Sequence, residues 1–346
     1  MASAVTVIGA GVFGLSCAWE CLRRGVRVRV IEAAHVGAGS SGGTVGALAP
    51  HAPENWNAKK QMQLDALVAA EGWWAGIADT GGVDPGYART GRLQPVDAPA
   101  LDRTRARIAA AAEVWPAPFR MDLTDAPASP LLPVSDTGLY LTDNLTARLS
   151  PRRAGAALAA AIRAKGGEIM EGAGPQSPKG ADGPVIWATG AAGLAALSED
   201  LGRTLGTGVK GQSALLACAA PDAPQVFAEG LHIVPHADGT VAIGSTSERD
   251  FEDPTATDAQ LDALIARARA LCPALTDAPV IDAWAGVRPR AASRAPLLGA
   301  WPERPGHFVA TGGFKIGFGM APAVAAMMVD LVVNGTDRIP VAFRLA

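Results

Sequence analysis

Three glycines near the start of the chain have the spacing of a turn that binds phosphate. Residues 5–8 are apolar and predict a buried strand, and residues 15–24 predict a helix after the turn. In such a unit the first glycine permits the tight turn, the second lets the backbone approach a pyrophosphate, and the third lets the helix pack against the strand. The predicted turn consists of Gly9, Ala10, Gly11, Val12, Phe13 and Gly14.

An acidic residue completes this unit. Residues 26–31 alternate apolar side chains with arginines, which predicts a second strand, and Glu32 follows it, 18 residues after Gly14. A carboxylate at this point accepts hydrogen bonds from a ribose 2′-hydroxyl and repels a 2′-phosphate. The unit therefore predicts a dinucleotide site that disfavours NADP and leaves NAD and FAD. The chain carries one complete unit of this kind, so we expect it to bind one dinucleotide.

Other predicted elements are of the type that packs around such a unit. A glycine- and serine-rich connection, residues 35–56, directly follows Glu32, and long connections of this kind are usually functional or disordered. Apolar strands are predicted at residues 185–188, ending in Thr189-Gly190, and from residue 307, leading into a glycine-rich turn. Further helices are predicted at 61–77, at 151–165, and after the last turn up to Asn334-Gly335, with a strand at 166–170.

Two stretches between these elements have a different pattern. Residues 79–144 are rich in proline and offer one candidate strand, at 91–96. Residues 203–247 have the pattern of β-structure, including a hairpin that turns at Asp238-Gly239, and a helix is predicted at 257–273. We therefore expect an antiparallel part to be inserted between nucleotide-binding units.

Composition excludes several classes of function. The net charge of −3 gives no reason to expect nucleic acid or an anionic membrane as a partner. The cysteines, Cys17, Cys21, Cys218 and Cys272, show no metal or redox spacing, and we expect those at 17 and 21 to be small buried residues. The histidines are scattered, so no metal site is expected. We see no signal peptide, and the apolar segment 321–333 is too short to span a bilayer, so a soluble cytoplasmic protein is expected.

Several stretches, in this order, resemble the D-amino acid oxidase family of FAD-dependent oxidoreductases, which includes glycine oxidases, sarcosine oxidases and D-amino acid dehydrogenases. They are the opening fingerprint, GAGSSGGTVGALAPH, GRLQPV, KGQSALL, IVPHADGTVAIGSTSE, WAGVRPR and TGGFKIGFGMAP. The resemblance implies FAD and an α/β (α+β) fold. A Rossmann-like FAD-binding domain would comprise residues 1–78, 145–200 and 285–346. An inserted, mainly antiparallel β substrate domain would comprise residues 79–144 and 201–284.

The resemblance also implies which further residues contact the flavin nucleotide. The serine- and glycine-rich segment runs past the pyrophosphate and along the flavin, the strand ending in Thr189-Gly190 lies beside the adenine half, and the last glycine turn lies at the pyrimidine edge. Sarcosine oxidases attach FAD through a cysteine before that turn; residues 293–313 contain none, so non-covalent FAD is expected. The residues implied are Ser40, Ser41, Gly42, Gly46, Ala47, Leu48, Ala188, Thr189, Gly190, Gly312, Gly313, Phe314, Lys315, Ile316 and Gly317.

Three residues are implied to act on the substrate. Arg288 matches the arginine that binds the substrate carboxylate, and its guanidinium fork fits that group. Lys315 matches a lysine beside the carboxylate and the flavin ring, and His51 is a third candidate. Arg290 and Arg294 stand where relatives more often show T-P-D; either they bind a second acidic group on the substrate or they have no such role.

The implied activity is oxidation of the C–N bond of a small amino acid or N-substituted amino acid by hydride transfer to flavin N5. The resulting imine would hydrolyse, and oxygen or another acceptor would take the electrons. One alternative is a 2-hydroxy acid dehydrogenase of the same superfamily, which needs a base, with His51 as the candidate. A second is a flavin-carrying subunit of a multi-subunit dehydrogenase. The sequence does not specify an oligomeric state.

Overall fold

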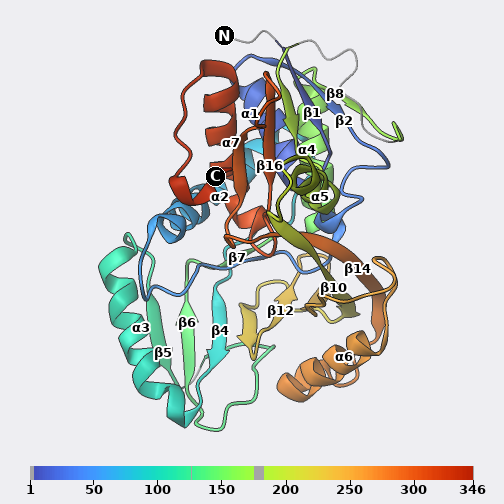
Figure 1. The fold of residues 1–346 in the computed structure, drawn as a ribbon. Helices are drawn as coiled ribbons and strands as arrows, with labels where there is room; N and C mark the ends of the chain where they lie inside the picture. Colours follow the sequence, from blue (N-terminus) through green and yellow to red (C-terminus); the bar gives the residue numbers. More distant parts are fainter. Residues whose placement is uncertain (1–3, 126, 175–182, 346) are drawn as a thin grey trace.

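Two sheets, one above the other, organise the chain (Figure 1). The computed structural model describes residues 4–125, 127–174 and 183–345. The upper part in Figure 1 combines a mostly parallel sheet with helices, and the lower part is built around a mostly antiparallel sheet. The predicted mixed α/β architecture is therefore confirmed.

The upper sheet has the strand order β15-β16-β9-β1-β2-β8, with all neighbours parallel except β15 and β16. Strand β1 lies at its centre and its last four residues are buried, as its apolar sequence predicts. The strands are β1 (Ala4–Ile8), β2 (Arg27–Ile31), β8 (Glu168–Met170), β9 (Val185–Trp187), β15 (Leu297–Ala300) and β16 (His307–Thr311).

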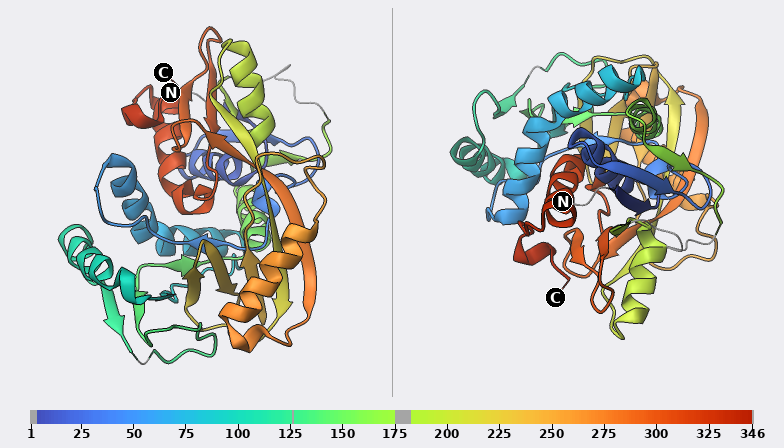
Figure 2. Two further views of the ribbon diagram at one scale, coloured as in Figure 1. Left: turned by 60° about the horizontal axis from the view of Figure 1, so that its bottom comes forward. Right: turned by 90° about the horizontal axis from the view of Figure 1, so that it is seen from above.

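Helices cover this sheet and pack against one another (Figure 2). Helix α1 contacts α4 and α7, and α2 also contacts both of these, whereas α5 packs against β16 and against two strands of the lower sheet, β10 and β14. Cys17 and Cys21 are buried in α1, as predicted. The helices are α1 (Val12–Arg23), α2 (Ala58–Gly81), α4 (Pro151–Ala164), α5 (Gly190–Asp200) and α7 (Gly317–Asn334).

Helix α7 is long and apolar enough to cross a membrane, but it forms part of the core. More than half of it is buried, and it lies against α1 and α2. Its acidic residue Asp330 accepts a hydrogen bond from Nη1 of Arg24 on the loop after α1, at 2.5 Å. The apolar run is therefore explained by packing. The helix ends before Gly335, whose φ of 69° provides the left-handed cap that the sequence predicts.

The lower sheet has the order β14-β10-β13-β12-β11-β4-β6-β5, and only β11 and β4 run parallel. Its strands are β4 (Arg92–Pro95), β5 (Met121–Thr124), β6 (Tyr140–Asp143), β10 (Gly206–Ala217), β11 (Gln225–Ala228), β12 (Leu231–Pro235), β13 (Thr240–Gly244) and β14 (Val280–Ala291). Helices α3 (Leu101–Val114) and α6 (Ala259–Leu271) flank it, and β3 (Ala47–Leu48) pairs with β7 (Ala147–Arg148) separately. The β12–β13 hairpin turns at Asp238-Gly239, as predicted.

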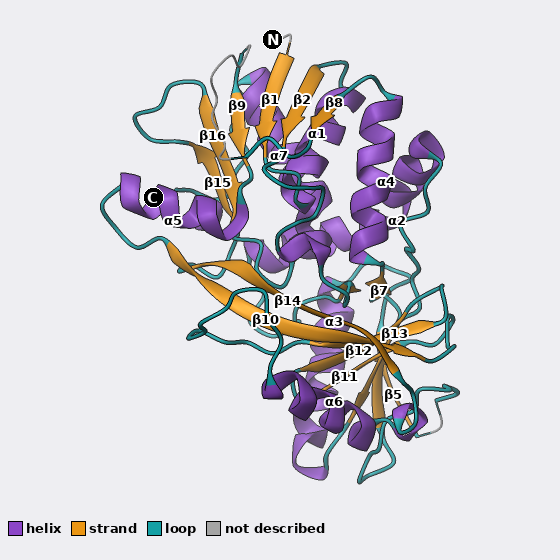
Figure 3. Ribbon diagram, turned by 90° about the vertical axis from the view of Figure 1, so that its right-hand side faces the viewer, coloured by secondary structure: helices purple, strands orange, loops and turns teal. Residues whose placement is uncertain are grey.

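The sequence underestimates the structure of residues 79–144. The prediction there was a single strand, but α3, β5 and β6 are present as well. Helix α3 buries only Thr104 and Ala111, so it has no wide apolar face that its periodicity could reveal. Strand β14 crosses the expected domain boundary at residue 285 and pairs with β10 along most of its length (Figure 3).

A substitution at Gly91 tests how tightly the start of β4 packs against the end of β6. The φ of Gly91 is 77°, and a Cβ added there would lie 2.6 Å from the carbonyl oxygen of Asp143. We expect Gly91→Ala to lower the free energy of unfolding by about 1–2 kcal/mol for the left-handed backbone and by a further 1–3 kcal/mol or so for the clash. Thermal unfolding followed by circular dichroism measures the sum.

Gly82→Ala is the matched control, because Gly82 has a φ of 66° and nothing within 4 Å of the added Cβ. Only the backbone cost should appear there. Equal losses of stability for the two variants would show that β4 yields to the extra methyl group.

Candidate active site

A cavity of about 800 Å³ lies between the two sheets. Its volume is in the range of ligand and cofactor sites, roughly 300–1,000 Å³. One end is lined by the turn after β1 and by the loops that follow β2, β9 and β16. The other end is lined by residues of β4, β11, β12 and β14. The upper part of the molecule thus supplies the end with the glycine fingerprint, and the lower sheet supplies the opposite end.

The first and third glycines of the fingerprint have the packing roles that their spacing predicts. Gly9 has a φ of 102°, and a Cβ there would lie 2.5 Å from the carbonyl oxygen of Ala188. A Cβ on Gly14 would lie 1.9 Å from the carbonyl oxygen of Gly9, so only glycine lets α1 approach the turn this closely. Gly11 precedes α1 and lacks a side chain that could cap it, which keeps the helix N-terminus accessible to an anion.

Glu32 is held in place by the same turn. One of its carboxylate oxygens accepts a hydrogen bond from the backbone N–H of Ala10 at 2.7 Å, and the other accepts one from Ala34 at 3.0 Å. Each oxygen has a lone pair left, and the residue lines the cavity. This geometry is compatible with the predicted hydrogen bonds to a ribose.

The serine- and glycine-rich segment folds back onto the fingerprint. The hydroxyl oxygen of Ser41 accepts a hydrogen bond from the N–H of Val12 at 3.0 Å, which ties the segment to the first turn of α1. Gly46 has a φ of 68°, and a Cβ there would lie 1.8 Å from the carbonyl oxygen of Leu149. Glycine is therefore required where the segment passes under the loop before α4.

Most of the residues implied by the resemblance lie in the cavity wall. Six predicted residues do not line it. Five of them have a lining residue on both sides in the chain, and Gly14 has one on one side only, Phe13. The five are Ala10, Gly42, Leu48, Gly312 and His51. The predicted residues that line it are Gly9, Gly11, Val12, Phe13, Glu32, Ser40, Ser41, Gly46, Ala47, Ala188, Thr189, Gly190, Arg288, Gly313, Phe314, Lys315, Ile316 and Gly317.

Arg288 is the most deeply buried of the substrate candidates. It is 8% exposed, and its Nη1 donates a hydrogen bond to the carbonyl oxygen of Thr246 at 3.3 Å. Burial lowers its pKa to about 10, an effect that the charge of Glu248 opposes. Within the described part of the chain, no carboxylate forms an ion pair with it. A Cβ on Gly211 would lie 1.8 Å from its Nη2, so the guanidinium occupies the space that this glycine leaves on β10.

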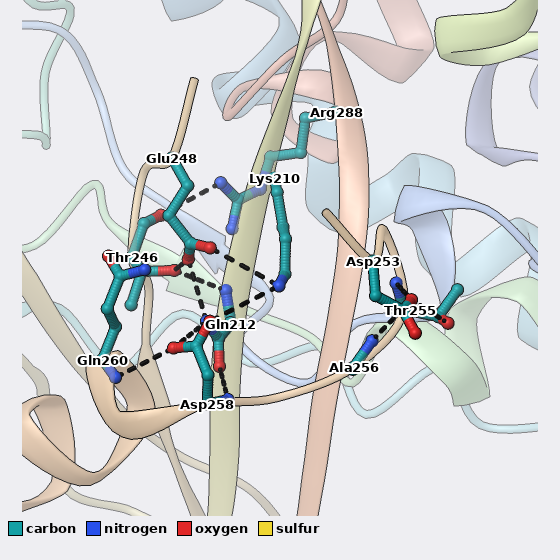
Figure 4. Close-up of polar contacts among 10 residues, drawn as sticks. All are labelled: Lys210, Gln212, Thr246, Glu248, Asp253, Thr255, Ala256, Asp258, Gln260 and Arg288. Carbon is teal, nitrogen blue, oxygen red and sulfur yellow. Dashed lines mark hydrogen bonds and ion pairs between the residues drawn. The ribbon is translucent and has the colours of Figure 1, made fainter. Parts of the chain in front are cut away.

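A buried polar cluster supports Arg288 from behind (Figure 4). The carboxylate of Glu248 accepts hydrogen bonds from the Thr246 hydroxyl and from Nε2 of Gln212, the latter at 3.1 Å. The ammonium of Lys210, which is 3% exposed, lies 3.6 Å from Glu248 and 3.7 Å from Asp258. This cluster fixes Thr246, whose backbone orients Arg288.

Lys315 lies in the glycine turn before α7 and faces the same cavity. Burial of its ammonium by the cavity walls lowers its pKa to about 8, and the positive charge of Arg288 adds to the effect. The side chain nevertheless remains accessible to solvent through the open cavity. Lys315 and Arg288 therefore bring two positive charges near each other, a pair that an anionic group would stabilise.

Sequence reasoning missed several cavity residues, and His232 and Arg92 are two of them. Burial lowers the pKa of His232 to about 3, helped by the charges of Arg92 and Lys315, so this imidazole is neutral, and its Nδ1 has no hydrogen-bond partner. Arg92 is 7% exposed and pairs with the fully buried Asp143 through Nε at 2.9 Å. His232 is a polar residue inside the otherwise apolar strand β12, which was an available signal, whereas Arg92 begins the mixed strand β4 and offers none.

Three other candidates do not belong to the cavity wall. His51 does not line it, and its ring and backbone N–H both contact the carboxamide oxygen of Gln63. The guanidinium of Arg290 lies 5.8 Å from the ring centroid of Phe314, and Arg294 is exposed; neither lines the cavity. In the part of the chain that is described, no cluster of three metal-binding side chains occurs either.

Comparison with known proteins identifies the family. The FAD dependent oxidoreductase family matches residues 4–331. The chain belongs to this family. FAD is therefore its cofactor.

Individual members of the family are similar over different lengths. A glycine oxidase from Pseudomonas putida is 31% identical over 98% of this chain and 97% of that protein. A glycine oxidase from Pseudomonas aeruginosa is 38% identical over 132 residues, which are 38% of this chain and 36% of that protein. The crystal structure of glycine oxidase from Geobacillus kaustophilus has a TM-score of 0.86 and 24% identity, covering 99% of this chain and 98% of that chain.

The residues of the cavity fit FAD. Gly9 and Gly14 allow the close approach of strand and helix that a pyrophosphate site needs, and Glu32 presents a carboxylate to the same end. The cavity then continues past the glycine turn to the lower sheet, which gives an isoalloxazine ring room beyond the nucleotide.

The attachment of this FAD can be tested directly. None of the four cysteines, all of which are described, lines the cavity, so we expect the FAD to be bound without a covalent bond. Acid precipitation of the yellow oxidoreductase should release all of its colour into the supernatant. Flavin that stays in the washed protein pellet would show a covalent link.

Proposed function

We propose that this FAD-dependent oxidoreductase oxidises the C–N bond of a small amino acid or N-substituted amino acid to an imine, which then hydrolyses. One observation carries the proposal: a buried arginine, Arg288, faces the cavity without a carboxylate partner among the described residues. The relatives named glycine oxidase support the same class of substrate. In this proposal the upper part of the chain binds FAD, and the lower sheet binds the substrate.

Arg288 has the role of carboxylate anchor. Its guanidinium presents parallel N–H donors that match the two oxygens of a carboxylate. The hydrogen bond to Thr246 and the space above Gly211 hold the group in one orientation. Because a shift of about 1 Å in the position of a substrate can cost about 100-fold in rate, this fixed orientation matters as much as the charge.

FAD, when bound, supplies the acceptor for the hydride from the substrate α-carbon. The neighbouring cations favour the neutral, reactive form of the substrate amine, because a protonated amine close to Arg288 and Lys315 would be repelled. His232, neutral and with a free ring nitrogen, adds a polar group without adding charge. Lys315 adjoins the N-terminus of α7, so both present positive potential to this region of the cavity.

The reaction partners in this proposal are the amino acid and an electron acceptor, oxygen or another oxidant. We further propose a cytoplasmic location, supported by the burial of the chain's long apolar helix α7 within the core.

Anaerobic mixing with candidate substrates tests the proposed function. Amino acids or N-substituted amino acids should bleach the flavin absorbance, and 2-hydroxy acids should not. Arg288→Lys keeps the charge and loses the fork, so its bleaching rate at low substrate concentration should fall by about 30-fold or more, equivalent to roughly 2 kcal/mol or more of lost transition-state binding.

Arg105→Lys serves as the control for this variant, because Arg105 is exposed on α3 and should give the wild-type rate. If no amino compound bleaches the flavin while a 2-hydroxy acid does, the proposed chemistry is wrong. If Arg288→Lys reacts like wild type, the anchor is another residue.

The pH dependence of inhibitor binding tests Lys315. Its lowered pKa of about 8 means that the ammonium is charged below this pH and loses its proton above it. A simple carboxylate that lacks an amine should therefore bind well at pH 7, and its Kd should rise as the pH passes through about 8 and beyond. Perturbation of the flavin spectrum provides the measurement.

Lys315→Met should bind the same carboxylate more weakly at pH 7 and should lose the rise in Kd above pH 8. Lys165→Met, on the exposed loop after α4, should retain it. A wild-type Kd that stays constant from pH 7 to 9 would mean that Lys315 does not face the ligand.

A further inference from the structure

Arg92 places a buried guanidinium in the cavity wall. A substrate with one carboxylate, bound by Arg288, gives this guanidinium no partner. Arg92 lies on β4, in the lower sheet, and is 7% exposed. Four strands separate β4 from β14, which carries Arg288. The two arginines therefore line the cavity from different strands and do not bind the same carboxylate.

The ion pair with Asp143 leaves most of the Arg92 fork available. Only Nε contacts Asp143, at 2.9 Å, and the other oxygen of Asp143 accepts the N–H of Thr146 at 2.8 Å. Among the described residues, neither Nη atom of Arg92 has a hydrogen-bond partner. Neither atom is among the buried side-chain atoms without a partner, so both are accessible to solvent. The Nη pair thus remains accessible and offers donors spaced for a carboxylate.

The groups around Arg92 define a small pocket at this end of the cavity. Its guanidinium carbon lies 6.0 Å from the ring centroid of Phe227, and this ring lies 4.6 Å from that of His232. The charges of Arg92 and Lys315 both depress the pKa of His232, so both cations are near this imidazole. Lys315 is in turn near Arg288, whose charge lowers the pKa of Lys315.

In the described part of the chain, no carboxylate forms an ion pair with Arg288 or Lys315, and Arg92 pairs with Asp143 through Nε alone. Among the described residues, the only carboxylate in the wall is Glu32, at the nucleotide end. Asp143 and Glu248 lie behind the wall, and each is already engaged by protein donors. A substrate with a single carboxylate, bound by Arg288, would leave the Nη donors of Arg92 with no partner but solvent.

We propose that the substrate carries a second carboxylate, and that Arg92 binds it while Arg288 binds the carboxylate next to the reacting carbon. This inference rests on the proposed function and specifies its substrate class as an acidic amino acid or an N-carboxyalkyl amino acid. It also assigns the second acidic group to Arg92, whereas the sequence pointed to Arg290 and Arg294.

Carboxylates without an amine test the pocket in the intact, FAD-containing protein. We titrate acetate, propionate, butyrate and valerate against malonate, succinate and glutarate, and follow the flavin spectrum. For equal carbon number, at least one dicarboxylate should bind about 10-fold to 100-fold more tightly than the monocarboxylate, as expected for an added hydrogen-bonded charge pair. If every monocarboxylate binds as tightly as its dicarboxylate counterpart, the proposal is wrong.

Anaerobic bleaching with amino compounds distinguishes the two sources of the second carboxylate. Faster reaction of D- or L-aspartate or glutamate than of the matching amides places it on the side chain, and faster reaction of N-carboxymethylglycine than of N-methylglycine places it on the nitrogen. If only compounds with one carboxylate bleach the flavin, the inference fails and the proposed function stands. If no amino compound bleaches it, the proposed function itself fails.

Variants connect the preference to Arg92. Removing Arg92 alone would strand a buried Asp143, so the pair is replaced together, as Arg92→Met with Asp143→Asn. The dicarboxylate-to-monocarboxylate affinity ratio should fall to near 1, whereas Arg105→Met, which removes an exposed charge, should keep the wild-type ratio. A wild-type ratio in the double variant, with FAD bound and an unchanged Tm, would overturn the assignment.

Discussion

The cavity depends on the pairing of β10 with β14. These two long strands run antiparallel from the region of α5 into the lower sheet and so connect the two parts of the molecule (Figure 3). Arg288 projects from this pair across Gly211, directly beside the cofactor cavity. A side chain at residue 211 would displace the guanidinium, and a shift in the pairing would move it to the other face. The position of Arg288 in the cavity wall is thus set by backbone hydrogen bonds.

Sequence reasoning succeeded where the signal is local. The strand–turn–helix unit of the fingerprint, the hairpin and the C-terminal cap of α7 each depend on residues close together in the chain. The same G-x-G-x-x-G spacing also occurs at residues 206–211, but there it lies within β10, so the spacing predicts a phosphate turn only together with its strand and helix. Arg92 and His232 could not be found in this way, because strand order in the lower sheet decides that they meet.

Electrostatics explains why several titratable groups here depart from their usual behaviour. Arg288, Lys315 and His232 all have lowered pKa values, and burial is the largest cause for each of them. For Lys315 and His232 the second cause is the charge of a neighbouring cation, Arg288 and Arg92 respectively, whereas Glu248 opposes the effect of burial at Arg288. His51, chosen from the sequence for its position after the glycine-rich segment, is turned toward Gln63 instead, because the segment bends back onto α2.

The division of the cavity wall between two sheets has an evolutionary consequence. The residues of the glycine fingerprint line the cavity from loops of the upper part, whereas Arg92, Phe227 and His232 line it from strands of the lower sheet. If the lower sheet binds the substrate as proposed, mutations on those strands would change which molecules are accepted without altering the loops at the other end. Such a scaffold lets a lineage acquire new metabolic roles in small steps while the redox chemistry is inherited unchanged.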